Sequence, residues 1–98
     1  MSKVWIPKKA GHDYTKAVKF GQIEVILDEE VSPFNIDRLD ERIKTAFEMA
    51  SADDYIIPAG PPILNMLMVK NWPFTHMKLL LFHARVRDYV YRELYLER

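Results

Sequence analysis

The sequence contains no cysteine, so disulfide bonds, thiolate metal sites and a cysteine nucleophile are all excluded. It also lacks any apolar run long enough for a signal peptide or for a membrane-spanning helix. Both absences fit a protein of the reducing cytosol. We therefore expect a cytoplasmic protein with no membrane partner.

Motifs for nucleotide binding and for nucleophilic catalysis are missing as well. There is no G-x-G-x-x-G and no G-K-[ST] sequence, which are the glycine-rich loops that hold phosphates. None of the three serines, Ser2, Ser32 and Ser51, lies in a nucleophile-elbow context. These absences predict no nucleotide cofactor and no serine-based catalysis.

The three histidines do not form a recognisable metal motif. His76 and His83 bracket one expected strand, and their odd spacing places the two side chains on opposite faces. We expect no metal, no cofactor and no catalytic residue, and hence a protein that is not an enzyme. The residues to inspect for an unrecognised activity are Asp28, Glu29, Glu30 and His12.

The composition is that of a folded soluble protein. The 98 residues, 49% of them hydrophobic and 29% charged, suit a single domain over residues 1–98. The net charge is zero, yet residues 1–20 carry +4, residues 21–60 carry −7 and residues 61–98 carry +3. Either these charges complement each other within one fold, or the basic ends form a surface that attracts an acidic partner.

Hydrophobic periodicity predicts an alternation of short strands and helices. Strands are expected at residues 3–7, 22–28, 54–58, 77–83 and 88–96, and helices at residues 14–20, 36–50 and 61–71. Pro7 restricts the first strand to an edge of the sheet, because proline donates no ladder hydrogen bond.

The two longer helices differ in character. The helix at 36–50 has apolar residues at helical spacing opposite a charged face. The helix at 61–71 is apolar almost all round, with only Asn65, Lys70 and Asn71 polar. Such a helix is buried either by its own fold or by a partner.

Residues 88–96 allow two assignments. Their aromatic and β-branched content favours the return strand of a hairpin. Val86, Val90 and Leu94 recur at intervals of four, so a terminal helix is the competing assignment.

Short connections and right-handed crossovers predict the arrangement of the strands. The strands at 22–28, 54–58 and 77–83 should be parallel, and the C-terminal strand should lie antiparallel at one side. The predicted fold class is α/β, a small sandwich with a mostly parallel sheet.

This order of elements resembles that of small uncharacterised α/β proteins encoded by bacteriophages and bacteria. The resemblance is carried by GQIEVILD, DDYIIPAG and LLLFHARVRDYVYREL, within residues 20–94. Phe82-His83 departs from the aromatic-then-acid pair expected after the strand. The resemblance implies this fold and an accessory role, and it implies no activity.

The turn at residues 58–60 lies between an apolar strand and a helix, where α/β proteins often bind ligands. A phosphate site there needs free backbone N–H groups, and Pro61 and Pro62 remove two of them. The acidic residues 28–30 are also expected on the neighbouring strand, where they would repel a phosphate. We therefore interpret the turn as structural.

Arginine and tyrosine are interleaved along the expected C-terminal hairpin and up to Arg98. The candidate partner-binding residues are Arg85, Arg87, Tyr89, Tyr91, Arg92 and Tyr95. Guanidinium groups and aromatic rings are the groups that bind phosphates and stack on bases. In a strand, however, the tyrosines share one face with Glu93, while Arg92 points the other way.

Two functions from different classes follow from these patterns. The leading hypothesis is a small non-enzymatic accessory protein that binds another protein or a second copy of itself as a homodimer. The apolar helix, the tyrosine-rich edge strand and the opposite charge blocks support it. The alternative is a nucleic-acid-binding protein that uses the Arg/Tyr-rich hairpin.

Overall fold

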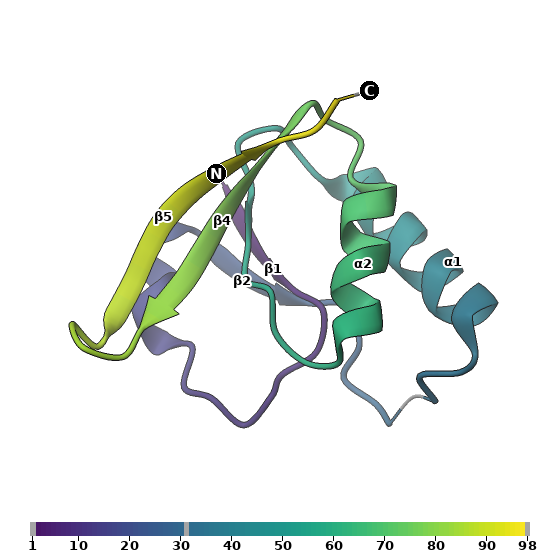
Figure 1. Ribbon diagram of the computed structural model, residues 1–98, viewed down its shortest axis with the longest axis horizontal. Coiled ribbons are helices and arrows are strands. Elements are labelled where there is room, and N and C mark those ends of the chain that lie inside the picture. The colour runs from purple at the N-terminus through teal and green to yellow at the C-terminus, as the bar shows by residue number, and fades with distance from the viewer. Residues whose placement is uncertain (1, 31, 98) are drawn as a thin grey trace.

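The computed structural model describes residues 2–30 and 32–97, which form a five-stranded sheet with helices (Figure 1). In chain order the elements are β1 (Lys3–Ile6), the 3₁₀ helix η1 (Thr15–Phe20), β2 (Gln22–Val25), α1 (Ile36–Ala46), the 3₁₀ helix η2 (Phe47–Met49), β3 (Tyr55–Ile56), α2 (Pro62–Asn71), β4 (His76–His83) and β5 (Asp88–Tyr95). This order matches the prediction, including a strand rather than a helix at the C-terminal end.

The sheet has the strand order β2-β1-β3-β4-β5. The first four strands are parallel to their neighbours, and β5 runs antiparallel to β4. The predicted α/β class, with a mostly parallel sheet and an antiparallel C-terminal strand, is therefore confirmed. β2 and β5 are the edge strands.

β1 lies inside the sheet, so the prediction of an edge position is wrong. It pairs with β2 on one side and with β3 on the other. Pro7 is tolerated because it follows the last paired residue, Ile6, and because the ladder with β3 involves only Val4 and Trp5. The carbonyl oxygen of Pro7 still accepts a hydrogen bond from the backbone N–H of Leu27 at 2.9 Å. The proline therefore removes no N–H group that the sheet needs.

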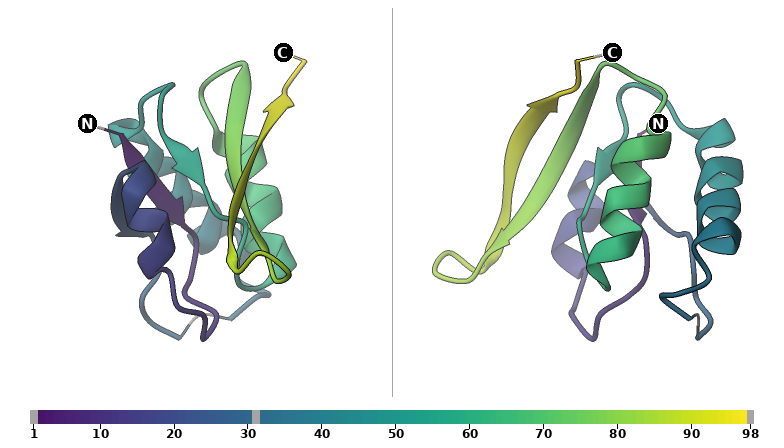
Figure 2. Two further views of the ribbon diagram at one scale, coloured as in Figure 1. Left: turned by 90° about the vertical axis from the view of Figure 1, so that its left-hand side faces the viewer. Right: turned by 45° about the vertical axis from the view of Figure 1, so that its right-hand side comes forward.

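Alternate side chains of β1 enter the two cores of the molecule. Trp5 belongs to a buried cluster with Phe47 and Trp72, on the side of α1 and α2. Val4 and Ile6 belong to a second cluster on the other face, where η1 lies. Figure 2 shows α2 and η1 on opposite sides of the sheet. Burial on both faces explains why β1 has no polar residue after Lys3.

Asp54 fixes β1 to the turn that precedes β3. It is 1% exposed, and its carboxylate accepts three hydrogen bonds. The donors are the backbone N–H of Lys3 at 2.9 Å, the indole N–H of Trp5 at 3.0 Å and the backbone N–H of Ser51 at 2.9 Å. A buried carboxylate is tolerated only with such donors, so the geometry gives Asp54 a structural role.

α2 is less buried than its composition suggests. Leu64, Leu67 and Met68 are buried, whereas Met66 is 65% exposed and Val69 is 36% exposed. The prediction that this helix is buried by its own fold therefore holds for one face of α2, and the other face is partly exposed.

The charge blocks contact each other within the fold. The Lys70 ammonium lies 2.9 Å from the Asp40 carboxylate, and the Lys78 ammonium lies 3.8 Å from that of Asp53. Both pairs join the basic C-terminal block to the acidic central block. They support the interpretation that the charges complement each other inside one molecule.

Candidate partner-binding hairpin and adjoining pocket

β4 and β5 form a hairpin that extends beyond the rest of the sheet (Figures 1 and 2). Their pairing runs from His76 opposite Tyr95 to His83 opposite Asp88, over eight residues of each strand. β3, the inner neighbour of β4, has only two strand residues. The outer half of the hairpin therefore lies beyond the ladder that joins β3 to β4.

Arg85 and Arg87 lie in the exposed turn of the hairpin. The φ angle of Arg87 is 53°, in the left-handed region, and its carbonyl oxygen accepts a hydrogen bond from the ammonium group of Lys16. The next residue, Asp88, forms an ion pair of 2.6 Å with Lys19. Two lysines of η1 thus contact the start of β5 and fix the position of the turn.

Tyr91 and Tyr95 lie on one face of β5, on either side of Glu93. Their hydroxyls donate hydrogen bonds to the Glu93 carboxylate, at 2.5 Å from Tyr91 and 2.6 Å from Tyr95. These two bonds hold the pKa of Glu93 below its usual range. The bond to Glu93 also raises the pKa of Tyr91 to about 12. At neutral pH this face therefore carries an ionised carboxylate between two neutral phenols.

The other two candidate residues on β5, Arg92 and Tyr89, do not join the Tyr91–Glu93–Tyr95 group. Arg92 lies on the opposite face of β5, as the alternation predicted, and its guanidinium donates to the carbonyl oxygen of Tyr91 at 2.7 Å. Tyr89 shares a face with Tyr91 but is only 7% exposed. The hairpin thus brings Tyr91 and Tyr95 together and places the arginines elsewhere. Arg98 lies outside the described residues.

Apolar side chains are exposed on both faces of the hairpin and in its turn. The exposed fractions are 40% for Leu81, 54% for Phe82, 63% for Val86 and 40% for Leu94. A group of exposed apolar side chains on one projecting element is typical of an interaction surface.

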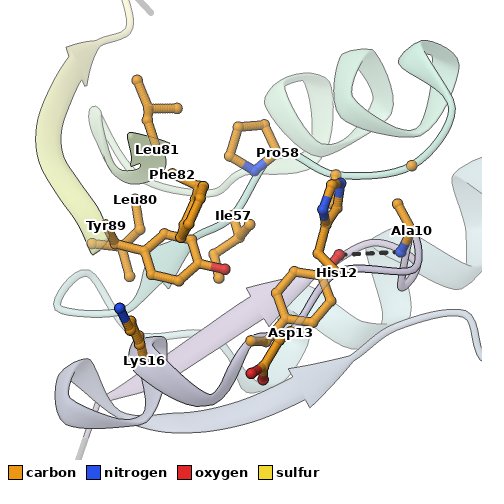
Figure 3. A pocket seen from close by; sticks show the side chains of 13 residues that line it. Ala10, His12, Asp13, Lys16, Ile57, Pro58, Leu80, Leu81, Phe82 and Tyr89 are labelled. Carbon is orange, nitrogen blue, oxygen red and sulfur yellow. Dashed lines mark hydrogen bonds between the residues drawn. The ribbon is translucent and has the colours of Figure 1, made fainter. Parts of the chain in front are cut away.

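A pocket of about 770 Å³ lies between the hairpin and the loop that follows β1 (Figure 3). Its walls come from this loop, from the residues that follow β3 and from the adjacent ends of β4 and β5. It is therefore at the carboxyl ends of two parallel strands, the usual place for a ligand in an α/β sheet. The lining residues with polar side chains are His12, Asp13, Tyr14, Lys16 and Tyr89.

The turn at residues 58–60 lines this pocket. The expectation of acidic residues on the neighbouring strand is wrong, because β1 lies between β2 and β3. Lys8 occupies that place, and its ammonium group donates to the carbonyl oxygen of Glu29 at 2.7 Å. Gly60 has φ of 76°, and a Cβ atom there would lie 3.3 Å from the Cβ of Lys8. The sequence interpretation missed the pocket because it placed β1 at an edge.

The acidic residues 28–30 and His12, named for an unrecognised activity, are not brought together. His12 lines the pocket beside the hairpin, and Asp28 lines a different, smaller hollow. The Glu29 carboxylate accepts two hydrogen bonds from the Arg42 guanidinium, at 2.8 Å and 3.3 Å, and this contact lowers the pKa of Glu29 to about 2. Within the described part of the chain, no group of three or more His, Asp or Glu residues could hold a metal ion.

The fold and the projecting hairpin define a small α/β protein with a mixed sheet. No helix among the described residues is long and apolar enough to cross a membrane. Within this class, the model of the family described as "Phage Pam3 gp32-like protein" matches residues 2–96, and the chain belongs to that family. The predicted link to proteins encoded by bacteriophages is thereby confirmed. Comparisons with curated proteins and with solved structures give no match.

Proposed function

We propose that this chain is a non-enzymatic accessory protein that binds another protein chain along the outer edge of β5. The partner that best fits this edge is a second copy of the chain. The observation that carries the proposal is an eight-residue edge strand that buries only Tyr89. Tyr91, Leu94 and Tyr95 are 42%, 40% and 73% exposed on it.

The edge of β5 is suited to strand addition. An uncovered edge strand presents N–H and C=O groups with which another strand can pair. Natural edges often block such pairing with proline, with lysine or by being short. β5 contains neither residue and is as long as β4. Backbone pairing would supply affinity, and the alternate side chains would supply specificity.

Charge complementarity favours one antiparallel register between two copies. When the two-fold axis passes beside Val90, Asp88 of each copy, which also forms an ion pair with Lys19 of its own chain, lies opposite Arg92 of the other. A register centred on Arg92 or on Glu93 places like charges directly opposite each other, which is destabilising. A register centred on Tyr91 forms no pair of opposite charges. The register centred on Val90 also keeps equivalent faces of the two strands on the same side.

Sedimentation velocity at micromolar concentration tests this proposal. The wild type should be a dimer, and either Asp88→Arg or Arg92→Asp should give monomers, because each variant places like charges opposite one another. The double variant exchanges the two charges and should restore the dimer. Arg38→Asp, at an exposed position of α1, is the matched control and should leave the dimer intact. A monomeric wild type, or a double variant that stays monomeric, would contradict the proposal.

Nucleic-acid binding has less support in the geometry. The ring of Tyr89 is buried, and the ionised Glu93 lies between Tyr91 and Tyr95, where it would repel a phosphate backbone. Fluorescence anisotropy with labelled single-stranded oligonucleotides should therefore stay flat at about 150 mM salt, where the screening length is roughly 8 Å. A rise that weakens with salt and is reduced by Arg85→Ala would favour the nucleic-acid alternative.

A further inference from the structure

The hydroxyl group of Tyr89 points into the pocket beside the hairpin (Figure 3). Tyr89 is 7% exposed, and no residue of the described part of the chain forms a hydrogen bond with this hydroxyl. This hydroxyl faces the open space of the pocket without a protein partner, so an occupant of the pocket can form a hydrogen bond with it. The volume of about 770 Å³ is in the range of sites for small molecules.

Aromatic rings form two sides of the pocket. On the loop that follows β1, the rings of His12 and Tyr14 are 6.3 Å apart and nearly perpendicular, at 84°. On the hairpin, the rings of Phe82 and Tyr89 are 5.4 Å apart at 74°. The faces of aromatic rings carry negative potential and attract cations within about 6 Å of the ring centre. Pro58 adds exposed apolar surface to the walls, whereas Ile57 and Leu80 are buried.

The carboxylate of Asp13 favours a cation on its side of the pocket. Hydrogen bonds from the side chain and backbone of Thr15 lower the pKa of Asp13, so its carboxylate is ionised at neutral pH. Burial, followed by the nearby Tyr14 and Asp13, raises the pKa of Tyr89. Burial, the largest cause, opposes a charge of either sign there, whereas the smaller effect of the Asp13 carboxylate opposes an anion alone.

Lys16 is the cationic side chain of the lining that opposes this preference. Its ammonium group donates to the carbonyl oxygen of Arg87 in the hairpin turn. Lys16 therefore provides a useful test, because its removal should change the affinity for a charged ligand in the direction opposite to the removal of Asp13.

We propose that this pocket binds an organic cation, an ammonium group on a small apolar body, between the ring pairs and beside the carboxylate of Asp13. The apolar body lies against Pro58 and the ring of Phe82. A polar atom of the ligand accepts or donates the hydrogen bond that the hydroxyl of Tyr89 lacks. The pocket lies between the hairpin and the chain that follows β1, whereas the proposed dimer pairs along the outer edge of β5. The site therefore does not depend on the dimer.

Three probes of similar shape and different charge test the proposal. They are choline, the neutral 3,3-dimethylbutanol and the anionic 3,3-dimethylbutanoate, titrated into the full chain while the NMR signals of the aromatic rings are followed. Choline should shift the signals of Phe82 and Tyr89 and bind at least about fivefold more tightly than the neutral alcohol, because cation–ring attraction adds to burial. The carboxylate should bind most weakly.

Variants of Asp13 and Lys16 test whether each charge changes the affinity for choline in the expected direction. Asp13→Asn should weaken choline binding by about threefold to tenfold and leave the neutral alcohol unchanged, as expected for a charge near the water-exposed rim. Lys16→Gln should strengthen choline binding. Asp37→Asn removes an exposed carboxylate on α1 and should change neither affinity. Thermal melting shows whether each variant remains folded.

The results that would overturn the proposal are equally specific. They are equal affinity for choline and the neutral alcohol, tighter binding of the carboxylate, or no shift of the Phe82 and Tyr89 signals with any probe. Unchanged choline affinity in a folded Asp13→Asn variant would also overturn it. None of these results bears on the dimer, whose test measures mass in the absence of ligand.

Discussion

β1 has four residues, pairs on both sides and buries three side chains, whereas β5 has eight residues, pairs on one side and buries one. Both strands are rich in aromatic and β-branched residues, so strand propensity does not distinguish them. They differ in what lies over them, since residues 4–6 of β1 are buried and residues 91–95 of β5 are exposed. The short inner strand therefore holds the fold together, and the long outer strand is available for contacts.

The largest effect should come from the residue that fixes β1. Asp54→Ala leaves the N–H groups of Lys3, Trp5 and Ser51 without their acceptor, and should lower the free energy of unfolding by about 3–5 kcal/mol. Urea denaturation followed by circular dichroism measures this loss. Asp54→Asn keeps one acceptor oxygen and should be affected less.

The neighbouring carboxylate provides the control for this prediction. The side chain of Asp53 is 80% exposed, so Asp53→Ala should change the free energy of unfolding by less than about 0.5 kcal/mol. Equal losses for Asp53→Ala and Asp54→Ala would show that β1 is not held by the buried carboxylate.

The second prediction compares the two faces of β4. Leu80 is fully buried and Leu81 is 40% exposed, although they are adjacent in one strand. Leu80→Ala should destabilise the protein by about 2–4 kcal/mol because it leaves a cavity, and Leu81→Ala by less than about 1 kcal/mol. Chemical denaturation of the two variants measures the difference. Similar losses at both positions would mean that the outer face of the hairpin is covered as well as the inner one.

The smallest effect on stability concerns the polar contacts on β5. The pKa of Tyr91 is about 12, above the ordinary 10.0, because its hydroxyl donates to Glu93. A raised pKa in the folded state adds stability below pH 10, and this stability is lost as the pH rises through the folded value. Glu93→Gln should move the ionisation of Tyr91 down toward 10 and lose this small stabilisation at every pH below 10, including pH 7.

Absorbance of tyrosinate during an alkaline titration measures this ionisation. The signal of Tyr91 is identified by subtracting the titration of Tyr91→Phe, since the chain has five tyrosines. Tyr95→Phe keeps the bond between Tyr91 and Glu93 and should leave the high value in place. A midpoint that does not change in Glu93→Gln would contradict the assigned contact.

The sequence was sufficient for the elements whose signal is local. The spacing of Leu39, Ile43 and Phe47 predicts one helix, which the structure divides into α1 and η2, because a helix in contact with a sheet repeats its apolar contacts every three or four residues. The alternation along β5 likewise predicts that Tyr91 and Glu93 share a face. The position of β1 was not predictable in this way, because the rule for proline concerns the ladder, and Pro7 lies just outside it.

The hairpin and the pocket also differ in how far the sequence predicts them. The sequence could place the six candidate residues on one hairpin because they are consecutive or nearly so. The pocket was missed because it joins His12, Tyr89 and the turn at 58–60, which only the strand order brings together. The burial of Tyr89 was also hidden, since a strand pattern gives the face of a side chain and not what covers that face.

The inner position of β1 also determines how the chain can assemble. Lys3 pairs with Gln22 in one ladder and Val4 pairs with Tyr55 in the other, so the second ladder closes a much longer loop. The additional chain entropy is about 0.9 kcal/mol on a logarithmic law of loop closure. The β4–β5 hairpin closes locally and can form early, but it joins the sheet only through β3. In the described sheet, the pairing of β1 with β3, which the hydrogen bonds of Asp54 reinforce, is therefore what joins β2 and β1 to β3, β4 and β5.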